Sequence, residues 1–161
     1  MAVRSAGILL WRRPVGGAAS GHDIEVFIAH MGGPFWAKKD DAAWSIPKGE
    51  YSDDEQALHA ALREFGEEIG VPAPELDYTL LGEFRQSSGK IVTAFAAESD
   101  FDVSEVHSNT FPVEWPPRSG RIREFPEVDR AEWMPIDAAR TRLVKGQVAV
   151  LDALEEVLAI G

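Results

Sequence analysis

The sequence predicts a fold of the α/β or α+β class, in which a β-sheet packs against a few helices. The chain has 161 residues, of which 45% are hydrophobic and 27% charged, and this is the size and composition of one globular domain with a buried core. Segments with strand-like and helix-like patterns are mixed along the chain, and mixtures of this kind form layered sandwiches. We therefore expect a single domain over residues 1–161.

The first part of the chain predicts two strands and a long helix. Apolar β-forming residues occupy Ala6–Trp11 and Ile24–His30, and the sequence PVGGAASGHD between them predicts a glycine-rich loop. Residues 31–49 contain several glycines and prolines and should be mostly loop, with a short strand at Trp44–Ile46. A helix is then expected from about Asp53 to Ile69, ended by the Gly-Val-Pro sequence that follows it.

The middle of the chain predicts a hairpin and a long loop. Asp77–Gln86 and Lys90–Glu98 have strand-like patterns and are joined by a Ser-Ser-Gly turn. Residues 100–127 contain the proline-rich sequences WPPRSGR and FPEVDR, and we expect them to be irregular. Loops of this length inside a domain usually have a function or are disordered.

The C-terminal part predicts a last strand and two helices. The strand is expected at Val128–Pro135 and is followed by a short helix over Ile136–Lys145. Gln147–Ala159 then has the apolar spacing of a closing amphipathic helix.

Composition and charge exclude several classes of protein. The chain has no cysteine, which excludes disulfides and thiolate metal sites and fits a cytoplasmic protein. The apolar run in the opening MAVRSAGILLWRR is too short for a signal peptide or a membrane span, so we expect no membrane partner. The net charge of −11 argues against binding to nucleic acid. An anionic small molecule would need arginines, lysines or a bound metal to offset this charge.

The helix predicted at Asp53–Ile69 has two distinct faces. Its large apolar side chains fall in one narrow sector when residues are spaced about 100° apart: Leu58, Leu62, Phe65 and Ile69. We expect this sector to be buried. Glu64, Glu67 and Glu68 fall in a second sector, and three small residues precede them in the same direction: Ala57, Ala60 and Ala61. The alanines should leave open space above the helix.

The three glutamates are unfavourable in this position unless a cation is present. Glu64 and Glu68 repel each other at i,i+4, which costs about 0.2–0.5 kcal/mol. All three are near the negative end of the helix dipole, at a further cost of about 0.3–1 kcal/mol each. Arg63 can offset Glu67, but the sequence places no arginine or lysine to neutralise the other two. A divalent cation would remove these penalties, although a solvated acidic face would have the same pattern.

The segment GEYSDDEQALHAALREFGEEIGV resembles the signature of the Nudix hydrolase family. Its fixed positions are filled by Gly49, Glu55, Arg63, Glu64, Glu67, Glu68 and Gly70. Phe65 departs mildly from the pattern, because that apolar position is more often aliphatic. The preceding WSIPKG, the opening AGILLWRR and the late EWMPIDAAR are also similar to Nudix sequences, so the resemblance covers most of the chain.

This resemblance implies an α/β/α sandwich with a mixed sheet that hydrolyses a diphosphate linkage with Mg²⁺ or Mn²⁺. By matching position, Glu64, Glu67 and Glu68 would coordinate metal, and one of them would help to deprotonate the attacking water. Glu55 would support the metal site, and Arg63 would orient the glutamates through ion pairs. The backbone carbonyl of Lys48 is a further candidate ligand. Metal ions that bridge phosphate oxygens and activate water make a protein nucleophile unnecessary.

Candidates for an additional catalytic acid and for substrate binding lie outside the signature. Glu127, six residues before Trp133, is the preferred acid because diadenosine polyphosphate hydrolases of this family have a similar spacing; Glu124 is the alternative. Several basic side chains are candidates for holding phosphates: Lys48, Arg85, Lys90, Arg118, Arg121 and Arg123. Three aromatic side chains could stack on a base or anchor the core and loops: Trp44, Trp115 and Phe111.

We expect the partner to be a small phosphorylated molecule, a nucleotide in the first instance. A dinucleoside polyphosphate is favoured by the arginine-bearing loop and the spacing of Glu127 and Trp133. Oxidised or ordinary nucleoside triphosphates, nucleotide sugars and diphosphoinositol phosphates remain alternatives, as does a non-catalytic nucleotide sensor or interaction module. The sequence leaves open whether the chain is a monomer or a homodimer.

Overall fold

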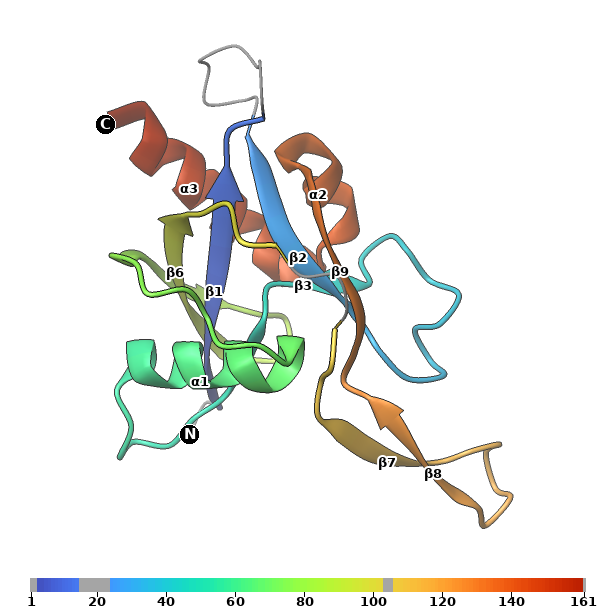
Figure 1. Cartoon of the computed structure of the whole chain (residues 1–161). Helices are drawn as coiled ribbons and strands as arrows, with labels where there is room; N and C mark the ends of the chain where they lie inside the picture. The colour runs from blue at the N-terminus through green and yellow to red at the C-terminus, as the bar shows by residue number, and fades with distance from the viewer. Residues whose placement is uncertain (1–2, 15–23, 103–105, 161) are drawn as a thin grey trace.

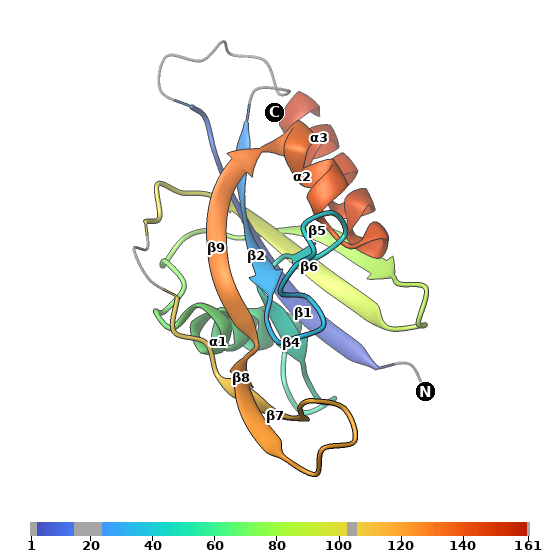
Figure 2. The same cartoon turned by 90° about the vertical axis from the view of Figure 1, so that its right-hand side faces the viewer.

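The computed structural model describes residues 3–14, 24–102 and 106–160. A seven-stranded mixed sheet separates helix α1 (Ala57–Ile69) on one face from α2 (Ile136–Arg142) and α3 (Val148–Ile160) on the other (Figure 2). The predicted α/β/α sandwich with a mixed sheet is confirmed.

The sheet is organised around strand β1 (Arg4–Arg12). It pairs antiparallel with β2 (Glu25–Met31) and with the short β4 (Lys48–Glu50), and parallel with β6 (Ile91–Glu98). Almost every residue of β1 is buried, as expected for a strand that is covered on both faces. Because β4 is held directly on this central strand, the backbone at Lys48 and Gly49 is extended, where the sequence predicted a loop.

The remaining strands extend the sheet on both sides. Strands β3 (Trp44–Ser45) and β9 (Val128–Pro135) pair antiparallel with β2. Strand β5 (Thr79–Arg85) pairs antiparallel with β6 and forms the hairpin that the Ser-Ser-Gly turn predicted. The short strand predicted near Trp44 and the strands predicted for β1, β2 and β9 are also present, with boundaries shifted by a few residues at most.

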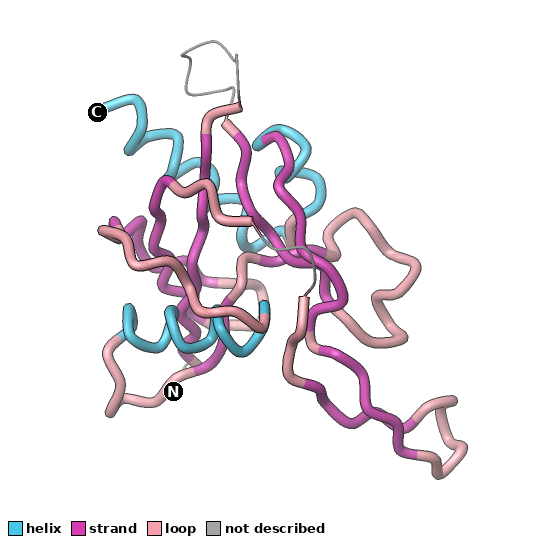
Figure 3. Tube along the Cα trace, in the orientation of Figure 1, coloured by secondary structure: helices cyan, strands magenta, loops and turns pink. Residues whose placement is uncertain are grey.

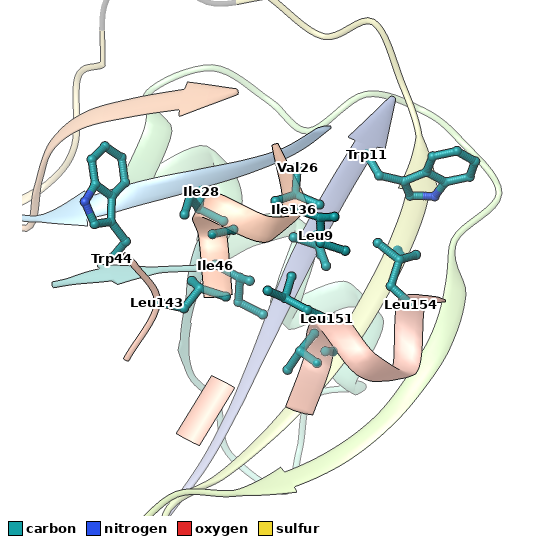
Figure 4. Packing of buried hydrophobic residues seen from close by; sticks show 14 of the residues in the cluster. Leu9, Trp11, Val26, Ile28, Trp44, Ile46, Ile136, Leu143, Leu151 and Leu154 are labelled. Atoms are coloured by element: carbon teal, nitrogen blue, oxygen red, sulfur yellow. The ribbon is translucent and has the colours of Figure 1, made fainter. Parts of the chain in front are cut away.

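Alternate side chains of β1 enter two separate hydrophobic cores. Ile8 and Leu10 pack toward α1, whereas Leu9 and Trp11 pack toward α2 and α3. Figure 4 shows the second core, in which Leu151 and Leu154 of α3 lie against the sheet. Each fully buried aliphatic side chain of this kind contributes about 1.5–3 kcal/mol to stability, so the sheet fixes both helical layers.

Helix α1 differs from its prediction at its start and on its buried face. It begins at Ala57, because Asp53–Glu55 form a separate turn in which the Glu55 N–H bonds to Ser52. It ends as predicted, at Gly70, whose φ of 94° is the left-handed conformation that favours glycine.

The side chains of α1 that pack on the sheet are mainly small. Ala60 and Ala61 are fully buried together with Phe65 and Ile69, whereas Leu58 and Leu62 are only partly buried. The prediction that the alanines leave open space above the helix is therefore wrong. Their small size instead lets the helix lie close to β1, and this brings the glutamates on the adjoining part of the helix near β4.

The proline-rich segment after residue 100 is more regular than predicted. Strands β7 (Thr110–Glu114) and β8 (Ile122–Pro126) pair with each other and form a two-stranded arm that projects from the body (Figure 1). Prolines are compatible with strands that have a free edge, because such strands do not need every N–H for pairing. The prediction of an irregular segment over 100–127 is wrong for the arm.

The last predicted helices are present with a different boundary. Helix α2 ends at Arg142, because Leu143 forms a bridge to Trp44, and a short 3-10 turn, η1 (Lys145–Gln147), leads into α3. Most of the predicted loop PVGGAASGHD falls on residues 15–23, outside the described residues. Among the helices that the structure describes, none has the length and apolarity needed to cross a membrane.

Candidate metal centre and substrate cleft

Arg63 joins the acidic residues of the predicted signature. Its guanidinium donates to both carboxylate oxygens of Glu55 at 2.9 Å, to Glu64 at 2.7 Å, and to Glu67 at 3.3 and 3.4 Å. The prediction that no arginine neutralises Glu64 is therefore wrong. The ion pair with Arg63 lowers the pKa of Glu55 and raises that of Arg63, so both groups stay charged at neutral pH.

Glycine at position 49 lets the carboxylate of Glu64 lie directly against β4. A Cβ atom at this position would overlap the Glu64 carboxylate and come within 2.6 Å of its Cγ. One turn further along α1, Glu68 accepts a hydrogen bond from the backbone N–H of Lys48 at 3.0 Å. Strand β4 and the C-terminal half of α1 thus hold two carboxylates and a stretch of peptide backbone at one place.

These carboxylates are poorly solvated in the absence of a cation. Burial raises the pKa of Glu68 to about 8, despite the opposing hydrogen bond from Lys48. Burial also raises the pKa of Glu64, against the effect of Arg63. Their negative charge is therefore costly in the protein alone, and a bound cation would remove this cost.

Glu127 lies beside this group, although it is far away in the sequence. Its N–H bonds to the carbonyl of Asn109, whose own N–H bonds to the carbonyl of Glu67 in α1, both at 2.9 Å. Its carbonyl accepts the N–H of Gly32, also at 2.9 Å. Burial raises the pKa of Glu127, and the charge of Glu67 raises it further. The alternative acid, Glu124, is exposed on β8 of the projecting arm.

Lys48, Glu68 and Glu127 line a common cavity of about 220 Å³, together with Trp36 and Phe111. A second cavity of about 230 Å³ adjoins it, because both are lined by Met31, Trp36, Ser45 and Lys48. The second cavity extends to the turn of the β5–β6 hairpin and to η1. The two cavities form a two-lobed cleft, with acidic residues in the first lobe only.

A buried glutamine supports the floor of this cleft. Gln147 is fully buried, accepts the N–H of Ile46 at 2.9 Å, and donates to the hydroxyl of Ser45 at 2.9 Å. Its side chain thus ties η1 to the segment that leads into β4. The backbone around Lys48 is therefore fixed by its pairing with β1 and by the hydrogen bond between Gln147 and Ile46.

A larger groove of about 1140 Å³ lies on the outer side of α1. Its lining is mainly apolar and includes Leu58, Leu62 and Tyr78, together with Arg63. None of Glu64, Glu68 and Glu127 lines it, so its size does not make it the centre of the chemistry. The smaller two-lobed cleft is the candidate site.

The structure contradicts the predicted substrate-binding role of Trp44. Its side chain is 1% exposed, packs edge-on against His30, and donates its ring N–H to Asp40 at 2.9 Å. Arg130 lies 5.1 Å from the ring centroid. Trp44 belongs to the core on the α2 and α3 side of the sheet (Figure 4).

The predicted basic residues are not gathered at the cleft. Lys48 lines both lobes. Arg118, Arg121 and Arg123 are exposed on the β7–β8 arm, and Arg85 is exposed at the end of β5; none of them lines either lobe. Lys90 instead pairs with Glu50 at 3.3 Å. Of these residues, Lys48 alone lines the cleft.

Trp36 is a cleft residue that sequence reasoning missed. It lies between β2 and β3 and lines both lobes, with the Lys39 ammonium 5.3 Å from its ring centroid. Figure 3 shows the connection between these two strands as a long loop. The sequence GGPFW marked this segment only as a loop. An aromatic residue after a Gly-Gly-Pro turn is a weak signal, because the same pattern occurs where a loop is anchored to the body.

Comparison with known proteins assigns the family. The model of the NUDIX domain matches residues 4–154. The chain belongs to the Nudix family. The resemblance carried by residues 49–71 therefore extends over nearly the whole chain.

The relatives within this family differ in what their names describe. The chain is 30% identical over 152 residues to an 8-oxo-(d)GTP phosphatase of Mycolicibacterium smegmatis, covering 88% of this chain but only 37% of that protein. It thus spans well under half the length of this curated relative. Among solved structures, it is similar to a C. elegans Ap4A hydrolase in a binary complex, with 18% identity, a TM-score of 0.66, and 98% and 99% of the two chains covered.

A second similar structure is the NUDIX domain of Shewanella oneidensis NrtR complexed with ADP ribose. It has 15% identity and a TM-score of 0.63, with 98% of this chain and 89% of that chain covered. At these identities, the structural likenesses show the fold.

The Nudix family generally uses divalent metal ions, and the donor atoms of this chain fit such an ion. The carboxylates of Glu64 and Glu68 supply hard oxygen donors, the Lys48 backbone carbonyl is a further oxygen donor, and the absence of a Cβ at Gly49 lets the Glu64 carboxylate lie against β4. Among the described residues, no three acidic or histidine side chains already surround a single point. In the arrangement described, Arg63 and the Lys48 N–H occupy carboxylate oxygens that a metal would use.

Proposed function

We propose that this chain is a metal-dependent hydrolase that cleaves a diphosphate linkage in a nucleotide. The observation that supports this most strongly is the group formed by Glu64, Glu67, Glu68 and Glu127. The first three come from α1, Glu127 lies between β8 and β9, and electrostatic interactions link all four. Such a group at the end of a cleft is suited to an anionic substrate only when a cation is bound.

Glu64, Glu67 and Glu68 would hold Mg²⁺ or Mn²⁺, with the Lys48 carbonyl as a further ligand and Glu55 in support. The bound ion would neutralise phosphate charge and make water more acidic. Arg63 would position the glutamates through its ion pairs with Glu55 and Glu64. Lys48 lines both lobes, and its ammonium would bind a phosphate oxygen.

Glu127 is the residue that we propose as proton acceptor for the attacking water. Glu127 lines the acidic lobe, and its raised pKa makes it a stronger base than an ordinary glutamate. Its backbone is fixed on both sides by Gly32 and Asn109. Glu68 is less suited to this task, because one of its oxygens accepts the Lys48 N–H.

The substrate class that we propose is a purine nucleotide with a polyphosphate chain. The names of the M. smegmatis relative and of the C. elegans structure refer to different molecules, but both contain a purine nucleoside and linked phosphates. In the two-lobed cleft, the phosphates of such a molecule would lie at the acidic lobe and its nucleoside in the second lobe, beside Trp36. A dinucleoside polyphosphate remains within this class, although the arm arginines that favoured it lie away from the cleft.

A substrate panel with matched variants tests the proposal. The purified chain should hydrolyse at least one of 8-oxo-GTP, GTP, Ap4A and ADP-ribose when Mg²⁺ is present, and not when it is chelated. Hydrolysis is read as released phosphate or pyrophosphate for the two triphosphates and as mononucleotide products for Ap4A and ADP-ribose. Glu68→Gln retains an oxygen that can accept the Lys48 N–H, so it should fold and lose turnover by a factor of about 100 or more.

Glu156→Gln, at an exposed position of α3, is the control and should retain full activity. Unchanged turnover in Glu68→Gln would refute the proposal. Tight nucleotide binding with no hydrolysis of any compound in the panel would instead support a non-catalytic sensor.

A further inference from the structure

The β7–β8 arm extends from the body as a ribbon of two strands. These strands pair with each other and with no other strand that the structure describes. All of their residues are exposed or only partly buried. An isolated two-stranded ribbon is at best marginally stable in water, and it gains stability when a further surface packs against it. The arm is therefore an element that a second surface would stabilise.

The arm tip, residues 115–123, combines an exposed apolar side chain with three arginines and contains no acidic residue. Ile122 is 65% exposed, more than any other large hydrophobic residue that the structure describes. Its neighbours in the chain are Arg121 and Arg123, and Arg118 lies in the turn before them. Arg123 lies 5.4 Å from the ring centroid of Phe125, but none of the three arginines forms an ion pair within the described residues. Their charge is thus available to another molecule.

The groove on the outer side of α1 carries the opposite charge. Its apolar lining includes Leu76, which is 39% exposed. Glu75 and Asp77 flank this leucine, are exposed, and also line the groove. In the part of the chain that the structure describes, neither carboxylate forms an ion pair. The groove therefore offers an apolar floor with free negative charge beside it.

The basic side chains of the groove do not cancel this negative charge. Arg63 is already paired with three carboxylates of the candidate metal centre. The Nδ1 of His59 lies 3.2 Å from a carboxylate oxygen of Glu55. The two free carboxylates therefore determine the charge that an incoming molecule meets in the groove.

The arm tip and the groove have complementary patterns of charge and apolarity. The tip has an isoleucine between two arginines, and the groove has a leucine between two acidic residues. Successive side chains of a strand point to opposite faces, so Ile122 can contact the apolar floor while the long arginine side chains bend around it toward the carboxylates. Long cationic side chains commonly lie along apolar surface with their charge at its edge. Exposed apolar surface with a polar rim is typical of protein interfaces.

The arm tip does not lie at the groove of its own chain. Figures 1 and 2 both show the β7–β8 turn projecting away from the body and from α1. The groove is lined by α1 and by residues 70–78, which follow it. A second copy of the chain presents the same tip without this restriction.

We propose that the arm tip of one copy docks into the α1 groove of a second copy. Ile122 lies on the apolar floor beside Leu76, and the arginines face Glu75 and Asp77. When the exchange is reciprocal, two copies close a dimer with two-fold symmetry. The contact involves no residue that lines the two-lobed cleft, so this proposal does not depend on the proposed function.

Sedimentation equilibrium tests the association. The unsubstituted protein should show a monomer–dimer equilibrium between micromolar and millimolar concentrations. Ile122→Asp places a carboxylate beside the acidic residues of the groove, so it should weaken the dimer by about 10-fold or more. Val157→Asp, at an exposed apolar position of α3, is the matched control and should associate normally. A chain that is monomeric throughout, or a dimer that Ile122→Asp does not weaken, would overturn the proposal.

Charge reversal distinguishes this contact from any other dimer interface. Arg121→Glu and Asp77→Lys should each weaken the dimer by about 10-fold, because like charges then meet. Both side chains are exposed, so the fold should be kept. The two substitutions in one chain restore opposite charges and should recover most of the affinity. Lys145→Glu, in η1 outside the arm and the groove, is the control. A double variant that associates no better than the single variants would refute the pairing of tip and groove.

Cysteine cross-linking locates the contact, because the chain has no cysteine of its own. Ile122→Cys and Leu76→Cys are made in separate copies, mixed, and oxidised with copper phenanthroline. A disulfide forms only where two Cα atoms approach within about 7 Å, so this pair should cross-link several-fold faster than Ile122→Cys with Val157→Cys. Equal rates for the two pairs would contradict docking of the arm tip in this groove.

Discussion

Replacing Gly49 by alanine should disable the metal centre while leaving the fold nearly intact. The added Cβ would lie 2.6 Å from Glu64 Cγ and overlap the carboxylate itself. Carbon atoms in contact are normally about 3.5–4.0 Å apart, so Glu64 has to move by about 1 Å or more. Such a displacement of a catalytic group lowers turnover by roughly 100-fold, or about 2.7 kcal/mol in the activation barrier.

The stability cost of this substitution should be small. The clash is with a side chain that can turn away, and β4 is still paired with β1. We expect kcat in Mg²⁺ to fall about 100-fold, with weaker Mn²⁺ binding by calorimetry and less than about 1 kcal/mol lost in chemical denaturation. Gly66→Ala is the matched control, because a Cβ there has no neighbour closer than 3.9 Å. It should be active and at least as stable, since alanine is the better helix former.

Two results would refute this reasoning. If Gly49→Ala turned over substrate at the normal rate, close approach of Glu64 to β4 would be irrelevant to catalysis. If Gly49→Ala and Gly66→Ala lost activity equally, the effect would come from α1 in general rather than from the contact between Gly49 and Glu64.

Three further outcomes are expected. In EDTA, the free energy of unfolding should fall as the pH rises from about 5 to 8 and then level off. Burial raises the pKa of Glu68 in the folded state to about 8, so the folded state binds one more proton than the unfolded state only below that pH. Urea titrations should show a drop of order 2 to 5 kcal/mol in the free energy of unfolding, which should be absent in Glu68→Gln and offset by Mg²⁺. Gln147→Leu leaves the buried N–H of Ile46 without its acceptor, so the free energy of unfolding should fall by about 1–3 kcal/mol. An unchanged denaturation midpoint would show that Gln147 does not support the floor of the cleft. Trp36→Ala should raise the KM for a hydrolysed nucleotide by about 10-fold or more, the value of one stacking contact, whereas Trp44→Phe should lower thermal stability and leave the KM as it was.

Sequence periodicity predicted the layers well but placed the buried face of α1 incorrectly. The helical spacing identified Phe65 and Ile69 correctly as buried, because large apolar side chains dominate such a pattern. It assigned Ala60 and Ala61 to open space, since small side chains carry little apolar weight. Their importance comes from allowing α1 to approach β1, which is a property of the packed pair and not of the helix alone.

The acidic residues of the site were predictable because their spacing lies within one helix. Glu127 was predictable only as one of two alternatives, since its position depends on hydrogen bonds to Asn109 and Gly32 that the sequence does not encode locally. The arginines after residue 117 were assigned to the site because a proline-rich loop can fold in any direction. Pairing of β7 with β8 instead carries them outward on the arm. Trp44 was misassigned because a tryptophan beside a loop gives no sign of which way it points.

The pairing of β1 with β6 also constrains when the site can form. Arg4 is opposite Ile91 and Trp11 is opposite Glu98, so the central strand pairs with a strand more than 80 residues later in the chain. Contacts between such distant segments are slow to form, because a long loop must close before they are made. During synthesis, β4 and the acidic helix are made before β6, and Glu127 emerges later still. We therefore expect metal to bind only after the whole chain has been made and has folded. When the protein is refolded from denaturant, metal binding should appear together with the slowest folding phase.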